Sequence, residues 1–187
     1  DIPHLALREP GSTRLGQRLR RLLLHGETPI QPMSEALLFF AARAQLLHEC
    51  ILPALQRGLV VICDRYHDAT VAYQGYAGQL DPAWLDRLGR DVTEEQLPQR
   101  TYMLDLAVDK GFARLNRSQD RMERKAIAFH KRVRRCYREL AAKEPKRILL
   151  LDATRPKTVL RETILQDMLT QLNHQKQREA LRRVIKK

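Results

Sequence analysis

An aspartate and an arginine, Asp64 and Arg65, directly follow the apolar run 59–63. Such a run predicts a buried strand, and open α/β sheets bind their ligands at the carboxyl ends of strands. A carboxylate at this place can hold hydrated Mg²⁺, and a guanidinium can grip phosphate oxygens. For an isolated pair, a salt bridge at the end of the strand is the competing interpretation.

A second pair, Phe39 and Arg43, is four residues apart on a segment with helical spacing of apolar residues, 34–56. Residues four apart lie on the same face of a helix, so the ring could stack on a base while the guanidinium reaches its exocyclic oxygen. The alternative is a core phenylalanine beside a solvated charge. Within this helix, Ser34 is the expected N-cap.

Three polar side chains, Thr70, Tyr73 and Gln74, come after the same apolar strand. Hydroxyl and amide groups can read the edge of a base by hydrogen bonding. The alternative is the polar start of a helix with a buried tyrosine.

Further upstream, Glu9 and Pro10 belong to an Arg-Glu-Pro-Gly-Ser-Thr turn that follows the segment 4–8. A Pro-Gly turn at the carboxyl end of a strand brings backbone N–H groups close to an anion, although such turns are common.

Arginines 114, 117 and 121 gather in a segment with few apolar residues, which suits a mobile lid. A solvated helix connection is the alternative.

The elements expected to position these residues alternate between strands and helices. Strands are expected at 4–8, 59–63, 101–106 and 147–151, with helices at 15–24, 34–56, 121–143 and from Pro156 to Leu172. This order predicts an α/β fold with a parallel sheet flanked by helices. We expect one domain over residues 1–172, followed by a basic tail, 173–187, that is a surface helix or partly disordered.

Composition narrows the class of partner. The formal charge of +12 over 187 residues favours anionic partners, whether nucleotides, nucleic acid or lipid headgroups. Three separated cysteines without a CxxC pair predict neither a disulfide framework nor a zinc site. We expect no membrane-spanning segment, because no uninterrupted apolar run approaches the length needed to cross a bilayer, so the sequence predicts a soluble protein.

Taken together, the turn at Glu9-Pro10, the pair Phe39 and Arg43, and the stretch Asp64-Arg65 through Gln74 resemble thymidylate kinase. The resemblance implies a P-loop NTPase-like fold, ATP-dependent conversion of dTMP to dTDP, Mg²⁺ as cofactor and a cytoplasmic location, with a homodimer among the expected assemblies. It implies that Phe39 and Arg43 hold thymine, that Thr70 contacts its N3, and that Tyr73 crowds the sugar 2′ position. The other implied roles are substrate binding by Glu9, Pro10 and Gln74, phosphate binding and catalysis by Arg65, catalysis by the lid residues Arg117 and Arg121, and Mg²⁺ binding through water by Asp64.

The sequence also departs from that family. Ala69 stands where serine is usual, and Ser12 stands where a second glycine is usual. No G-x-x-x-x-G-K-[ST] loop occurs, and the first residue is Asp1 rather than methionine. We therefore expect a truncated and inactive form that lacks the family's first strand, which would lie between the strands at 59–63 and 101–106. Exposed strand edges would leave such a chain poorly stable alone.

A different class of function is the alternative hypothesis. A non-catalytic relative could keep the fold and use its basic face, above all the tail, as a scaffold or a nucleic-acid contact. The sequence carries no RNA-binding or DNA-binding motif that would favour it.

Overall fold

The computed structural model describes the backbone of residues 2–185 and the side-chain environment of residues 2–173. Its strands are β1 (His4–Arg8), β2 (Val60–Asp64), β3 (Thr101–Asp105) and β4 (Ile148–Asp152). All four expected strands are present, and those after β1 differ from their expected bounds by a residue at one or both ends. Both observed pairings are parallel, as the alternation of strands and helices predicted.

The strands form two separate pairs, β1 with β2 and β3 with β4. Within the described residues, β2 and β3 do not pair with each other, in agreement with the expectation that they are not neighbours. The apolar side chains of Ile62, Leu104 and Leu150 are 47%, 57% and 37% exposed. Each pair therefore presents an unpaired edge and uncovered apolar surface, which are features that recruit another strand or cause aggregation.

The first helices arise where the sequence supplies helix signals. Helix α1 (Arg14–His25) is capped by Thr13, whose Oγ1 accepts a hydrogen bond from Gly16 N at 2.9 Å. The expected helix 34–56 is a continuous helical rod made of α2 (Pro32–Leu46), a π-helical turn η1 (Leu47–Ile51) and α3 (Leu52–Gln56). The N-cap expected at Ser34 is wrong: the helix begins at Pro32, because proline is well suited to the first helical position.

Two short helical stretches follow β2 and carry part of the expected site. They are α4 (His67–Thr70) and the π-helical turn η2 (Val71–Ala77). Single π-helical turns are frequent at functional sites. Helix α5 (Pro82–Val92) then begins at a cap formed by Asp81, whose Oδ1 accepts from Ala83 N at 2.9 Å.

The helix expected over 121–143 is shorter than predicted. After α6 (Val108–Ala113), residues 114–126 are irregular, and α7 runs from Ile127 to Lys143. The Asp120 Oδ1 atom accepts hydrogen bonds from Met122 N and Glu123 N, both at 2.9 Å. Asp120 thus caps a single turn over 121–124, closed by Arg124 N donating to Asp120 O at 3.0 Å, and this turn does not continue into α7.

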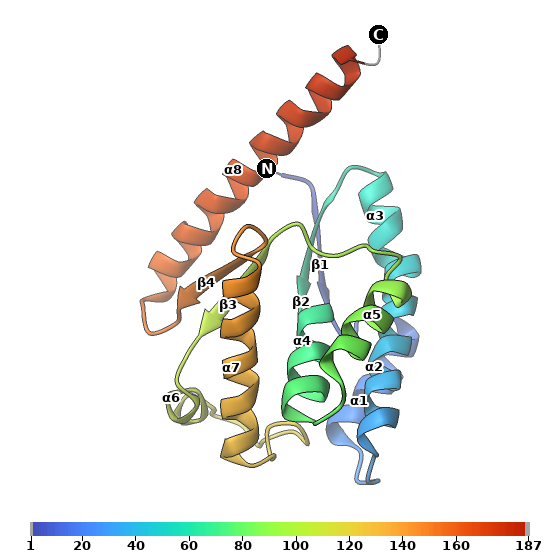
Figure 1. Ribbon diagram of the computed structural model, residues 1–187, viewed down its shortest axis with the longest axis vertical. Coiled ribbons are helices and arrows are strands. Elements are labelled where there is room, and N and C mark those ends of the chain that lie inside the picture. The colour runs from blue at the N-terminus through green and yellow to red at the C-terminus, as the bar shows by residue number, and fades with distance from the viewer. Residues whose placement is uncertain (1, 186–187) are drawn as a thin grey trace.

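The last helix, α8 (Lys157–Ile185), continues without a break across the expected boundary between domain and tail at residues 172–173. The ion pair between Arg100 and Asp167, at 2.7 Å, attaches α8 to the segment before β3. Figure 1 shows α8 extending away from the rest of the fold toward the C-terminus. The basic side chains of the tail beyond residue 173 lie outside the described residues.

Helix α7 connects the two strand pairs. It packs against η2 and against both strands of the β3–β4 pair. Figure 1 shows α7 beside β3 and β4. The main apolar cluster forms along this contact and includes Leu23, Ala72, Met122, Phe129 and Val133. The core therefore holds η2 and the irregular segment 114–126 against each other.

The rod Pro32–Gln56 is long and apolar enough to count as a membrane span, with a mean hydropathy of 1.2 over its most apolar window. This corrects the expectation that no segment would reach that length. The rod carries the buried charged residues Glu35 and Arg43, which pair with side chains from other elements. Core helices of soluble proteins also meet these criteria, so the rod is weak support for a membrane location.

Candidate functional site

The first two strands bring two of the predicted motifs to one sheet edge. Arg8 is the register partner of Asp64, and Glu9 N donates to Asp64 O at 2.9 Å. The Glu9-Pro10 turn therefore lies beside Asp64 and Arg65 at the carboxyl ends of neighbouring strands. This is the edge at which open parallel sheets place their ligands.

The turn after β1 is closed by its own polar groups. Ser12 Oγ accepts from Arg8 N at 2.8 Å and donates to Arg8 O at 3.2 Å. Gly11 has a φ of 144°, a conformation that side chains rarely adopt. Ser12 thus satisfies backbone groups of the turn.

Arg65 has a left-handed backbone, with a φ of 66°. This conformation is uncommon for a residue with a side chain and is concentrated at functional sites. Arg65 is exposed as a residue, and its guanidinium carbon lies 5.1 Å from the centre of the Tyr73 ring. The structure thus brings together two of the predicted residues, one directly after β2 and one from η2.

Arg43 is the centre of a buried polar network. Its side chain is only 1% exposed, its Nε lies 2.8 Å from the Glu9 carboxylate, and its Nη2 donates to Thr70 Oγ1 at 2.9 Å. Burial raises the pKa of the Glu9 carboxyl, and the charge of Arg43 opposes that rise. Arg43 Nη1 is buried without a hydrogen-bond partner among the described residues.

Phe39 lies one helical turn before Arg43 but has different neighbours. It is partly buried and packs against the main apolar cluster, as does Tyr73. The rings next to the Arg43 guanidinium are instead Phe40 and Tyr66, each with its centre 5.3 Å away. The sequence interpretation missed both, although Tyr66 directly follows Arg65.

Gln74 is buried, and its Nε2 donates to Glu35 Oε1 at 2.8 Å. Glu35 also accepts from Arg121 Nη2 at 2.5 Å and was not singled out from the sequence. Its position in the sequence could have indicated a buried polar role, because it is an acidic residue four places before Phe39 within an apolar helix.

The arginines of the expected lid have separate surroundings. Arg114 Nη1 donates to Ala153 O, in the loop after β4, at 3.1 Å. Arg117 is largely exposed and pairs with Glu123 at 2.7 Å, whereas Arg121 Nε donates to Leu23 O at 2.7 Å. The segment 114–126 is therefore connected at its two ends to different parts of the fold.

His67 is a further buried polar residue that the sequence interpretation missed. It is 2% exposed, and its Nε2 lies 2.8 Å from Asp86 Oδ1. Its Nδ1 is buried without a partner among the described residues. Burial lowers the pKa of His67 below its ordinary value of 6.5, so the folded state holds this imidazole neutral.

A pH dependence of stability follows from His67. Below pH 6.5 the unfolded chain binds a proton that the folded chain resists, so the free energy of unfolding should fall as the pH decreases, by up to about 1.4 kcal/mol per unit. Urea unfolding at a series of pH values measures this slope, which should be smaller in His67→Gln. Equal slopes in the two proteins between about pH 6.5 and 5 would contradict the assignment.

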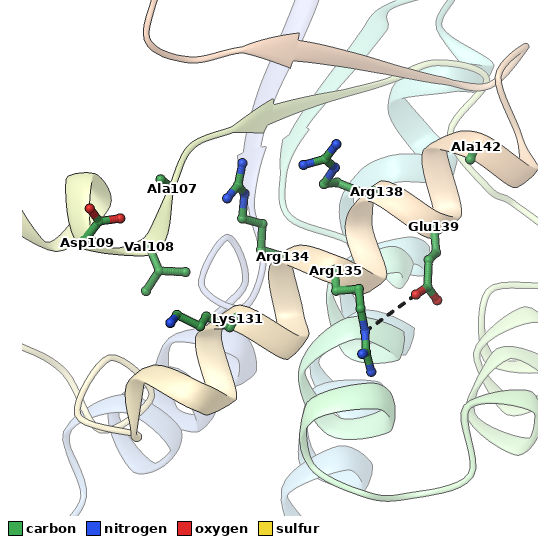
Figure 2. Close-up of a pocket in the computed structure, with 9 residues that line it drawn as sticks. All are labelled: Ala107, Val108, Asp109, Lys131, Arg134, Arg135, Arg138, Glu139 and Ala142. Carbon is green, nitrogen blue, oxygen red and sulfur yellow. Dashed lines mark ion pairs between the residues drawn. The ribbon is translucent and has the colours of Figure 1, made fainter.

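Two cavities lie on the other side of the domain. One, of about 500 Å³, is lined by the start of α6 and by the basic face of α7, including Lys131, Arg134 and Arg138, as Figure 2 shows. The other, of about 300 Å³, lies at the carboxyl ends of β3 and β4. Its lining residues include Asp105, Lys110, Arg134, Asp152 and Thr154.

The carboxylates within the described residues do not gather into a metal-binding cluster of three or more side chains. Asp64 is exposed at the end of β2. A single exposed carboxylate fits the way proteins hold Mg²⁺, which keeps several of its waters and takes further oxygens from phosphates. The donor set is therefore compatible with a cation shared with a phosphorylated ligand.

Comparison with known proteins adds an independent finding. Residues 2–164 match the family model described as thymidylate kinase. A thymidylate kinase of Thermomicrobium roseum is 44% identical over 163 residues, which cover 86% of this chain and 77% of the relative. Thymidylate kinases of Synechococcus sp. (strain JA-3-3Ab) and Cutibacterium acnes are 47% and 42% identical, covering 80% and 92% of this chain and 72% and 84% of those relatives.

Proposed function

The chain belongs to the thymidylate kinase family, and on that premise we propose which of its residues bind dTMP and which bind ATP. The membership gives a P-loop NTPase fold and the function, ATP-dependent phosphorylation of dTMP to dTDP in deoxynucleotide biosynthesis. Because phosphoryl transfer leaves a protein little covalent chemistry to perform, the residues at the site must align the substrates and neutralise charge.

The observation that carries the thymine assignment is the unpartnered Arg43 Nη1. A buried donor without a partner is rare, and an acceptor on a ligand would satisfy it. The exocyclic oxygen of thymine is such an acceptor. Thr70 Oγ1, which already accepts from Arg43, has a second lone pair for the thymine N3–H, and Phe39 supplies an aromatic face.

Arg65 is proposed to hold the acceptor phosphate. Arg65 lies at the ligand edge of the β1–β2 pair, and the Tyr73 ring against its guanidinium limits its movement. Guanidinium groups bind phosphate oxygens with paired, charge-assisted hydrogen bonds. Tyr73 would then face the sugar, and the Glu9-Pro10 turn would lie beside the phosphate.

Mg²⁺ is the proposed cofactor, held by Asp64 through water. When bound, the cation neutralises charge on the phosphates. The chain's own contribution is to place the Asp64 carboxylate next to Arg65. A negative and a positive side chain then lie at the same end of β2, where the phosphate would bind.

For ATP, we propose the cavity at the ends of β3 and β4, next to the loop Asp152-Ala153-Thr154. Arg114 connects that loop to the segment 114–126, which carries Arg117 and Arg121. Positive charge brought over the transferred phosphoryl group would stabilise the transition state. Arg117 is exposed and therefore accessible for that role, whereas Arg121 is engaged with Glu35.

Three proposals concern the chain as a whole. The unpaired edges of β2 and β3 are where the family's central strand, with its G-x-x-x-x-G-K loop, would pair. The exposed Met33 and Leu37 on α2 support a homodimer.

The comparisons favour the kinase over the alternative of a scaffold or nucleic-acid-binding protein. The tail is assigned no role.

Calorimetry with Arg65→Ala tests the phosphate assignment. Loss of charge-assisted hydrogen bonds should weaken dTMP binding about ten- to hundredfold, while thymidine, which lacks the phosphate, should bind both proteins alike. In a protein with turnover, the same change should remove most of it. Arg57→Ala serves as the control, because Arg57 is an exposed arginine at the C-cap of α3, before the amino end of β2. Equal dTMP affinity in Arg65→Ala and the control would reject the assignment.

A further inference from the structure

Glu35 lies where three separate parts of the chain meet. Its carboxylate is 4% exposed and comes from α2. The Oε1 atom accepts from Gln74 of η2 at 2.8 Å and lies 3.6 Å from Lys125 Nζ. The Oε2 atom accepts from Arg121 at 2.5 Å. One buried carboxylate thus holds an amide from the dTMP side and two cations from the segment 114–126.

Two of the three partners of Glu35, Gln74 and Arg121, are attached to other parts of the fold. Gln74 directly follows Tyr73, the ring against which Arg65 lies. Arg121 is fixed to the end of α1, because its N donates to Leu24 O at 2.9 Å and its Nε donates to Leu23 O at 2.7 Å. Phe39, of the proposed thymine site, lies one turn beyond Glu35 on α2. Contacts of Glu35 therefore extend from the proposed base pocket to the second half of the segment 114–126.

The energetics make these contacts interdependent. A buried carboxylate that loses its cations is strongly destabilised, so Glu35 and the pair Arg121 and Lys125 must stay together or separate together. The amide of Gln74 shares an oxygen with Lys125. A shift of η2 when the base pocket is filled would therefore change the position of Glu35 and, with it, the two cations of the lid segment.

We propose that Glu35 is a positioning residue that couples occupancy of the dTMP site to the closure of residues 114–126. This inference rests on the proposed function, since it takes the side of η2 that faces Arg65 as the dTMP side. Coupling of this kind requires that dTMP binding and lid order each change the other by the same factor. Glu35 would act through Gln74, Arg121 and Lys125, without touching either nucleotide.

Backbone hydrogen exchange of the full chain, with and without saturating dTMP, tests the coupling. In the unaltered protein, dTMP should slow exchange within residues 114–126 by about fivefold or more. In Glu35→Gln, dTMP should still bind, with affinity within about fivefold of the unaltered protein, but the slowing in residues 114–126 should disappear. Glu49→Gln is a matched control on the same helical rod, where Glu49 is exposed and accepts from Gln45 at 2.9 Å.

The outcomes separate this inference from the proposed function. Absence of dTMP binding by the unaltered protein would refute the proposed function and the coupling with it. Binding with the same slowing in Glu35→Gln as in Glu49→Gln would overturn the coupling alone. If circular dichroism shows Glu35→Gln unfolded, Lys125→Met replaces it, because Lys125 is 32% exposed and its loss leaves the Glu35 to Arg121 pair in place. Slowing in Lys125→Met should then be reduced, and undiminished slowing would again overturn the coupling.

Discussion

Replacing Arg43 by alanine is expected to lower the free energy of unfolding by about 3–5 kcal/mol, because it leaves the Glu9 carboxylate buried without its cation. Glu9 is 2% exposed, and burial already raises the pKa of its carboxyl. The substitution also removes the donor to Thr70 and the guanidinium between the rings of Phe40 and Tyr66. Urea unfolding measures the loss.

A matched control and a double mutant distinguish burial of charge from general damage. Arg135 pairs with Glu139 across 3.6 Å on the exposed face of α7, so Arg135→Ala should change stability by less than about 1 kcal/mol. Adding Glu9→Gln to Arg43→Ala removes the uncompensated charge and should recover part of the loss. A loss in Arg43→Ala no larger than in Arg135→Ala would show that the buried pair does not have the role assigned to it.

Gly89→Ala is expected to destabilise the fold by about 1–3 kcal/mol or more, because α5 has no room for a Cβ at this position. That atom would overlap the Nδ1 and Cε1 atoms of His67 and would lie 3.1 Å from Cε1 of Phe40. The imidazole cannot easily move away, since it is buried and hydrogen-bonded to Asp86. The midpoint of thermal unfolding should therefore fall by several degrees.

Gly111→Ala provides the control for Gly89→Ala. Gly111 lies in α6, where an added Cβ would meet only Leu106 Cδ2, at 3.9 Å, so alanine should leave stability unchanged or raise it. Shortening the crowded ring with His67→Ala should reduce the penalty of Gly89→Ala, because the two changes share one contact. Equal melting temperatures for Gly89→Ala and Gly111→Ala would contradict the claim that α5 packs too closely on His67 to admit a Cβ at position 89.

Much of the fold was predictable because local patterns determine it. The four apolar runs became strands, and the polar residues after β1 and β2 reached one edge because parallel strands end together. The helix boundaries were harder, since Ser34 is a good cap in isolation but Pro32 starts the helix earlier. Asp120 likewise caps a separate turn before α7, which residue spacing does not distinguish from the helix itself.

The site was predictable in its residue types but not in their partners. Arg43 and Thr70, which the resemblance assigns to one thymine pocket, share a hydrogen bond. The ion pair of Arg43 with Glu9 spans 34 positions of the chain and follows only from the packing of α2 against the turn after β1. Glu35 and His67 were missed for the same reason: burial gives them their importance, and their partners lie far along the sequence.

The most direct test of a thymine pocket at Arg43 is calorimetric titration of the chain with dTMP and, separately, with dCMP. The two ligands share sugar and phosphate, but cytosine carries an amino group where thymine carries its exocyclic oxygen O4. The guanidinium donor would face another donor in dCMP, so we expect dTMP to bind and dCMP to bind at least about a hundredfold more weakly. Equal affinity for the two nucleotides, or no binding of dTMP, would contradict the account.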